Sequence, residues 1–161
     1  MQEVCFSNNG IMDEMVEGTK TIHSIPELAS LAEEILEKLS ISEQAVVMAL
    51  SGDLGVGKTS FVKELGKALG VQEEITSPTF AIMKSYKTTH TNFPILTHID
   101  AYRIEDIEEM KVLRLEEFLH DPHRIICIEW PERVEKLLPE NKISISFTIN
   151  PDESRDITYA Y

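Results

Sequence analysis

The apolar residues of the chain change their spacing along the sequence, and this spacing predicts alternating helices and strands. Residues 25–39 carry apolar side chains three and four positions apart, which is typical of an amphipathic helix, and Ser24 suits its start. Residues 45–50 form an unbroken apolar run, as expected for a strand that is covered on both faces. A glycine-rich turn follows, and residues 60–69 predict a second helix that ends at Gly70.

The second half of the chain alternates in the same way. We expect strands at 80–86, 95–99 and 124–128, an acidic helical stretch with a break in the middle at 105–119, and a helix at 131–137. The polar stretch between the first two of these strands suits a hairpin. Period-two alternation at 143–149 and 155–159 predicts a closing antiparallel pair. Strands that alternate with helices predict an α/β fold, a three-layer sandwich around a mostly parallel, mixed sheet.

The length of the chain, 161 residues, fits one domain, which we place at residues 24–161. Residues 1–23 show no period, and we expect an N-terminal extension there. No apolar run approaches the ~18 residues of a membrane span, so we expect no membrane association. The N-terminus lacks the pattern of a secretory signal, and Cys5 and Cys127 cannot form a disulfide framework. A cytoplasmic location is the resulting expectation.

The charge of the chain is strongly acidic and unevenly distributed. Asp and Glu number 28 against 15 Lys and Arg, a formal net charge of −13. Residues 1–44 sum to −7 and residues 100–140 to −6, whereas residues 45–99 sum to +1 and residues 141–161 to −1. Phosphate backbones are bound by clustered cations, so this chain is not expected to bind nucleic acid strongly by itself. An RNA pathway remains open to it if other subunits hold the RNA.

One segment in the near-neutral block carries a specific chemical signal. Residues 52–59 (GDLGVGKT) match the phosphate-loop pattern G-x-x-x-x-G-K-[ST], and they stand between the predicted strand and helix. Such a loop surrounds a polyphosphate with backbone N–H groups at the positive end of a helix, and glycines keep side chains out of the way. Lys58 is expected to reach the β- and γ-phosphates, and the Thr59 hydroxyl to ligate Mg²⁺. The candidate nucleotide-binding residues here are Gly52, Asp53, Leu54, Gly55, Val56, Gly57, Lys58, Thr59 and Ser60.

Two acidic residues stand where a phosphate-loop protein places its catalytic groups. Asp100 ends the run ILTHID and Glu129 ends the run RIICIE, so each strand delivers a carboxylate at its last residue. Ligands gather at the carboxyl ends of parallel strands. A solvated or helix-capping carboxylate is the alternative for either residue alone, but two acids at equivalent strand ends favour a functional role.

Three further segments follow the phosphate loop in a fixed order: SPTF at 77–80, HIDAYR at 98–103 and EWPE at 129–132. Together with GDLGVGKT they resemble the TsaE family of small bacterial ATPases, which are required for threonylcarbamoyladenosine modification of tRNA. The resemblance covers roughly residues 25–157.

This resemblance implies a P-loop NTPase sandwich, ATP binding with Mg²⁺, and weak hydrolysis that is completed by the partners TsaB and TsaD. Carried over by position, Thr59 and Glu129 are the Mg²⁺-associated residues, Asp100 is the functionally important acid, and Thr79 is a switch-like residue near the γ-phosphate. Trp130 matches the tryptophan beside the nucleotide. The chain departs from the family at Leu28, where a threonine or a similar polar residue usually lies near the adenine.

Other reactive residue types have more ordinary interpretations. His98 is more often a packing or hydrogen-bonding residue than a catalyst at such a strand end, and Arg103 suits an ion pair as well as a contact with a partner. His120 and His123 lack further metal ligands nearby. Cys127 lies within an apolar strand, which predicts a buried, inert thiol.

Three functions stay open at this point. The leading one is a Mg²⁺-dependent ATPase that acts with TsaB and TsaD. A small-metabolite P-loop kinase is the second, although the acidic residues 100–140 are a poor source for a basic lid. The third is a nucleotide-sensing interaction module without essential hydrolysis.

Overall fold

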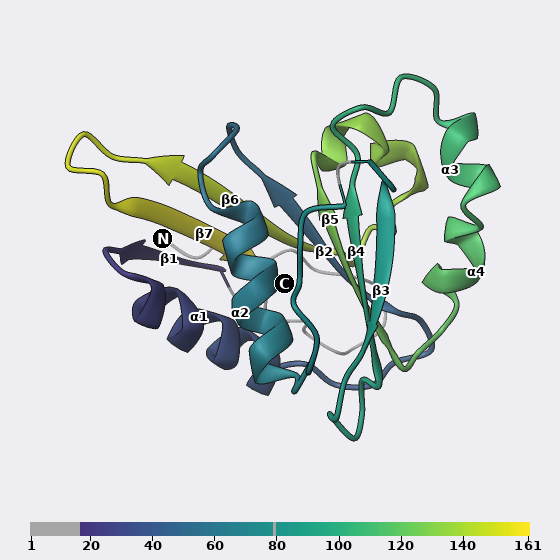
Figure 1. Cartoon of the computed structure of the whole chain (residues 1–161), viewed down its shortest axis with the longest axis horizontal. Coiled ribbons are helices and arrows are strands. Elements are labelled where there is room, and N and C mark those ends of the chain that lie inside the picture. The colour runs from purple at the N-terminus through teal and green to yellow at the C-terminus, as the bar shows by residue number, and fades with distance from the viewer. Residues whose placement is uncertain (1–16, 79) are drawn as a thin grey trace, which may run out of the picture.

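Seven strands form one mixed sheet in the computed structural model, which describes residues 17–78 and 80–161 (Figure 1). The strands are β1 (Glu17–Ile22), β2 (Val46–Ser51), β3 (Met83–Lys87), β4 (Ile95–Asp100), β5 (Arg124–Glu129), β6 (Ile143–Ile149) and β7 (Arg155–Ala160). Their order across the sheet is β1-β7-β6-β2-β5-β4-β3. The central four, β6, β2, β5 and β4, are mutually parallel. Only β7 and β3 run against them, so the predicted mostly parallel, mixed sheet is confirmed.

Helices cover both faces of this sheet and give the predicted three layers. Helices α1 (Ile25–Glu37) and α2 (Lys58–Ala68) pack on one face (Figure 1). The opposite face carries α3 (Glu108–Val112), α4 (Leu115–Leu119) and two 3₁₀ turns, η1 (Pro131–Arg133) and η2 (Glu135–Leu137). Strand β2 lies between both cores: Met48 faces the first and Val47 the second. This two-sided burial explains its unbroken apolar run.

The start of α1 and the break in the acidic stretch were predicted correctly, whereas α2 begins at Lys58, two residues before its expected start. Ser24 caps α1, because its hydroxyl accepts a hydrogen bond from the amide of Glu27 at 3.4 Å. Between α3 and α4 the chain turns at Arg114, whose φ of 59° is left-handed and cannot continue a helix. None of the described helices is long and apolar enough to cross a membrane.

Strand β1 lies within the segment for which we expected no element. It pairs antiparallel with β7, from Glu17 opposite Ala160 to Ile22 opposite Arg155. Only Ile22 of this edge strand is buried, so the sequence EGTKTI carries no apolar alternation to reveal it. Gly18 has a specific reason to be glycine, because a Cβ there would lie 2.6 Å from the Tyr159 ring. The division of the chain at residue 23 into extension and domain stays a prediction.

Two other predicted elements differ from the structure. The strand expected at 80–86 begins only at Met83, because the amides of Ala81 and Ile82 both donate to the carbonyl of Pro78 and make a turn. The helix expected at 131–137 is the pair of 3₁₀ turns η1 and η2. Trp130, at φ 58°, precedes them in left-handed geometry, and the short turns replace a continuous helix.

Candidate nucleotide-binding site

The carboxyl ends of three parallel strands lie at one edge of the sheet, and the candidate functional residues lie at or directly after these ends. Strand β5 lies between β2 and β4, with Leu50 opposite Glu129 and Glu129 opposite Asp100. The two acids that end their strands in the sequence are therefore neighbours in space. The phosphate-loop segment leaves β2 at the same edge and leads into α2 (Figure 1).

The loop conformation depends on its glycines. Gly52 has φ 138°, and a Cβ there would lie 2.6 Å from the backbone oxygen of Phe147 on β6. Gly57 caps α2 at φ 117°. Residues with a side chain rarely adopt either backbone geometry, so these glycines let the backbone fold tightly around the helix start. Lys58 and Thr59 follow as the first two residues of α2.

The Lys58 side chain folds back over its own loop. Its Nζ donates hydrogen bonds to the carbonyl oxygens of Gly52 at 2.6 Å and Asp53 at 2.8 Å, and it lies 4.2 Å from the centre of the Trp130 ring. The residue is only 4% exposed. Burial lowers the pKa of the Lys58 ammonium, and the nearby carboxylates of Glu129 and Asp100 oppose that shift.

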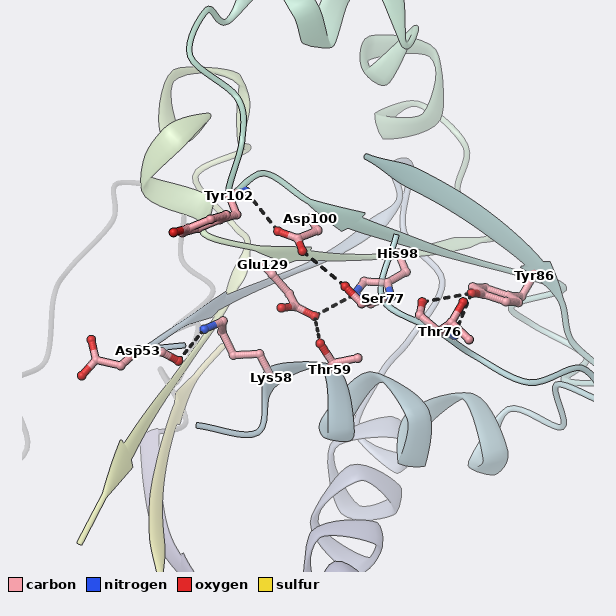
Figure 2. A network of polar contacts seen from close by, with 10 residues as sticks. All are labelled: Asp53, Lys58, Thr59, Thr76, Ser77, Tyr86, His98, Asp100, Tyr102 and Glu129. Carbon is pink, nitrogen blue, oxygen red and sulfur yellow. Dashed lines mark hydrogen bonds and ion pairs between the residues drawn. The ribbon is translucent and has the colours of Figure 1, made fainter. Parts of the chain in front are cut away.

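Glu129 is the centre of the polar network at the helix start (Figure 2). Its Oε1 accepts a hydrogen bond of 2.7 Å from the Thr59 hydroxyl and lies 2.8 Å from Nε2 of His98. A carboxylate oxygen only accepts, so the hydrogen of the second contact belongs to His98. Glu129 is 5% exposed, and these contacts compensate for its removal from water.

Asp100 is held by a separate set of contacts. Its Oδ1 accepts from the amide of Tyr102 at 3.0 Å, and its Oδ2 accepts from the Ser77 hydroxyl at 3.4 Å (Figure 2). The segment that carries Ser77 is anchored in turn by the buried Tyr86, whose hydroxyl lies 3.3 Å from the amide and 3.4 Å from the carbonyl of Thr76. Tyr86 lies on β3, which pairs with the strand that carries Asp100. Through Thr76, this residue therefore helps to fix the position of the Ser77 hydroxyl that donates to Asp100.

Two cavities flank the loop. One, of about 280 Å³, is lined by Lys58, Thr59, Asp100 and Glu129 together with Trp130, and so brings the predicted residues into one cleft. The second, of about 230 Å³, lies on the other side of the loop, and its walls come from β1, α1, β6 and β7. Together they provide one polar and one more apolar compartment beside the same loop.

The structure places the other sequence candidates as follows. Thr79 and Cys5 lie outside the described residues. Arg103 lines the first cavity with its guanidinium 5.1 Å from the Phe80 ring, and within the described part of the chain it forms no ion pair. His120 and His123 each place Nδ1 beside a backbone carbonyl, at 2.6 Å and 3.2 Å.

Cys127 is fully buried, and its burial raises the pKa of the thiol far above the ordinary range. This confirms the prediction of a buried thiol.

Sequence reasoning missed several residues of the site. In the sequence, Tyr86 is only the last position of a predicted strand, and it belongs to none of the four motifs. Arg155 lines the second cavity, and its Nε donates to the carbonyl of Val56 at 3.2 Å, although 99 residues separate them. Ile22, the last residue of an edge strand without an apolar pattern, and the following His23 also line that cavity. The pairing of β1 with β7 is the feature that brings these residues to the loop.

Comparison with known proteins points to one family. A family model described as "Threonylcarbamoyl adenosine biosynthesis protein TsaE" matches residues 22–157. The chain is similar to "tRNA threonylcarbamoyladenosine biosynthesis protein TsaE" of Treponema pallidum, with 41% identity over 73% of this chain and 84% of the relative. It is similar to the protein of that name from Bacillus subtilis, with 37% identity over 70% of this chain and 68% of the relative. Among solved structures, Bacillus subtilis YdiB matches with a TM-score of 0.71 and 25% identity, over 91% of this chain and 86% of that one.

Proposed function

The chain belongs to the TsaE family, and from that premise we propose that it binds ATP with Mg²⁺ and hydrolyses it slowly, acting with TsaB and TsaD in threonylcarbamoyladenosine modification of tRNA. The observation that carries the proposal is the contact of Thr59 with Glu129, 2.7 Å long, at the start of the helix that follows the phosphate loop. It joins the two residues that a P-loop NTPase uses for its cation.

The phosphates would lie against the loop and the start of α2, where backbone N–H groups and the helix dipole favour anions. The Lys58 ammonium lies beside the loop, where it could bind these phosphates. Its ammonium contacts two neutral carbonyls, and phosphate oxygens would replace these with stronger, charge-assisted partners. Burial lowers the pKa of this ammonium, and the carboxylates of Glu129 and Asp100 oppose that shift and so favour the charged form that phosphate would meet.

The residues present fit Mg²⁺. Thr59 and Glu129 offer hard oxygen ligands, and the described residues contain no cluster of three or more His, Cys, Asp or Glu that could enclose a metal. Mg²⁺ typically takes only one or two protein ligands and completes its shell with phosphates and water. When bound, the cation would neutralise charge on the transferred phosphoryl group.

Asp100 is suited to position the attacking water. It lies next to Glu129 across the strand pair, it is 8% exposed, and it lines the same cavity as Lys58. Its two oxygens are oriented by the Tyr102 amide and the Ser77 hydroxyl. Such a fixed carboxylate can accept a hydrogen bond from water, so its contribution would be orientation and proton acceptance.

The second cavity is suited to the adenine base. It adjoins Gly55 and Gly57 of the loop and is walled by Ile22, Leu28 and Ile157, which present apolar surface to a ring. The family resemblance implies a polar residue where Leu28 stands, so base binding here would depend more on packing than on a hydroxyl. The volume of about 230 Å³ suits a single heterocycle.

Large exposed side chains in and beside the first cavity support completion of the site by partners: Leu54 and Tyr102 line it, and Phe80 lies against Arg103, which also lines it. Leu54 is 78% exposed, Phe80 91% and Tyr102 45%. Apolar residues of this size that gather around a binding site favour a protein contact. TsaB and TsaD would cover this rim, exclude water from the phosphates and accelerate a reaction that the isolated chain performs slowly.

The test is release of inorganic phosphate from ATP by the purified chain, alone and with TsaB and TsaD. We expect slow release by the isolated chain and a marked rise with the partners, and Lys58→Ala abolishes both. Absence of ATP binding, or an unchanged rate with the partners, would contradict the proposal. Formation of ADP that requires a small-molecule acceptor, with the phosphoryl group transferred to that acceptor and not released as inorganic phosphate, would support the kinase alternative instead.

The variant Glu129→Ala distinguishes a nucleotide-sensing module from an ATPase whose hydrolysis is essential. If this variant binds ATP and the partners and still supports tRNA modification, hydrolysis is not essential and the sensing function replaces the proposed one. Loss of modification with ATP binding intact supports the hydrolytic cycle.

A further inference from the structure

His98 is a fully buried polar residue whose side chain, among the residues that the structure describes, hydrogen-bonds to Glu129 alone. It lies on β4, two residues before Asp100, and its side chain is 0% exposed. Nε2 lies 2.8 Å from Oε1 of Glu129 on the neighbouring strand (Figure 2). Within residues 17–78 and 80–161, its Nδ1 has no hydrogen-bonding partner.

The unpaired Nδ1 is informative. A buried polar atom without a partner costs free energy, and an apolar side chain on this strand would avoid the cost. Leu96, two residues earlier on the same face of β4, is buried in the apolar core, so an apolar side chain is compatible with that face of the strand. The imidazole therefore offers nothing to packing that a hydrocarbon could not supply, and its specific contribution is the N–H that it directs at Glu129.

Glu129 receives a second hydrogen bond at the same oxygen. Oε1 accepts from the Thr59 hydroxyl as well as from His98, which leaves Oε2 outside both contacts. In the phosphate-loop motif, Thr59 is also the residue expected to ligate Mg²⁺. Its hydroxyl would therefore take part in two interactions, the hydrogen bond to Glu129 and the bond to the cation. His98 has no second role, and its contact fixes Oε1 whichever partner Thr59 takes.

We propose that His98 is a positioning residue that orients the Glu129 carboxylate for its work with the Mg²⁺–nucleotide complex. This inference rests on the proposed function, because it assigns His98 a part in that same site. Residues that orient a metal-associated carboxylate typically contribute 10–100-fold to metal affinity or activity, so a clear effect is expected at this distance from the ligand.

Two amide variants separate positioning from packing. In His98→Gln the amide nitrogen reaches the position of Nε2, whereas in His98→Asn it reaches only that of Nδ1. Binding of a non-hydrolysable ATP analogue is measured over a range of Mg²⁺ concentrations. We expect His98→Asn to raise the Mg²⁺ concentration for half-maximal binding by about tenfold or more, while His98→Gln stays close to the wild type. Binding without Mg²⁺ stays unchanged in both.

The controls distinguish the possible failures. In a Glu129→Gln background, His98→Asn is expected to add no further change in Mg²⁺ requirement. If His98→Asn keeps the wild-type requirement, or if both amides raise it equally, His98 is a packing residue and the inference is wrong. If the wild-type chain binds no nucleotide with Mg²⁺, the proposed function fails and this inference fails with it.

A measurement on the wild-type chain covers the case in which a variant does not fold. Nitrogen-15 NMR of the histidine rings reports whether the Nε2 hydrogen of His98 persists when Mg²⁺ and the analogue are added. The inference requires that this hydrogen-bonded signal remains in the bound state. Its disappearance on binding would overturn the assignment.

Discussion

The ammonium of Lys58 lies 4.2 Å from the centre of the Trp130 ring while it donates hydrogen bonds to two carbonyls of its own loop. This places the residue expected to hold the phosphates directly on an aromatic ring at the end of β5. A cation over an indole face is electrostatically attracted to it. Any ligand that draws Lys58 away must therefore change the surroundings of Trp130.

Nucleotide binding is expected to change the fluorescence of the chain. Trp130 is the only tryptophan, so its emission reports this one site. Addition of ATP with Mg²⁺ should give a saturable change as Lys58 moves to the phosphates. Lys58→Ala should lower nucleotide affinity by at least about tenfold, since charge-assisted hydrogen bonds contribute ~1.5–3 kcal/mol. Lys63→Ala, on the same helix, is the matched control and should keep both the signal and the affinity.

Asp100→Asn is expected to slow hydrolysis while it preserves binding. The amide keeps an acceptor for the Tyr102 N–H and a group that can pair with the Ser77 hydroxyl, so the local geometry persists without the charge. Loss of a positioned proton acceptor typically costs ~10²–10⁴-fold in rate. Single-turnover phosphate release gives the rate, and fluorescence titration gives the affinity. Asp106→Asn, at an exposed aspartate, should change neither. An unchanged rate in Asp100→Asn would remove the residue from the mechanism.

Alanine at Gly52 is expected to destabilise the fold more than alanine at Gly55. Both glycines have positive φ, but a Cβ at Gly52 would lie 2.6 Å from the Phe147 backbone oxygen, whereas at Gly55 no atom lies within 4 Å. Gly55→Ala should therefore cost only backbone strain, about 1 kcal/mol. Gly52→Ala adds a steric clash and should cost at least about 2 kcal/mol. Urea unfolding measures both free energies, and equal losses would contradict the role of the contact with β6.

The stability of the chain is expected to fall between pH 10 and 12 because of Tyr161. Its hydroxyl is buried without a hydrogen-bonding partner among the described residues, and burial raises its pKa from 10.0 to about 12. The unfolded chain releases this proton first, so the folded state holds more protons in that range and loses stability as pH rises.

Tyr161→Phe should remove this part of the alkaline decline. At neutral pH the substitution should be neutral or stabilising by up to about 1 kcal/mol, since it deletes an unpaired polar group and keeps the ring near Lys38. Tyr102→Phe, on the exposed rim, is the control. Chemical unfolding at pH 7, 10 and 11 tests both statements, and a decline in Tyr161→Phe as steep as that of the wild type would contradict the first.

Much of the fold and of the candidate site could be predicted where a local pattern records burial. The unbroken apolar run of β2 and the helical spacing of α1 indicate which faces are covered, and both elements were found within a residue or two of their expected bounds. Phe80 shows the limit, because its apolar character predicted a strand, yet it is 91% exposed in a turn. A single exposed aromatic residue cannot be distinguished from a core residue by spacing alone.

The sequence by itself determined the phosphate loop, and it placed Asp100 and Glu129 at strand ends, because these are properties of neighbouring residues along the chain. Only the tertiary structure decided that β5 lies between β2 and β4, which sets Glu129 beside Thr59 and Asp100. It also decided that His98 directs its N–H at that carboxylate and that Arg155 reaches the loop across 99 residues. Strand order and long-range contacts arise from packing among distant segments, and no local pattern of residue types encodes which segments meet.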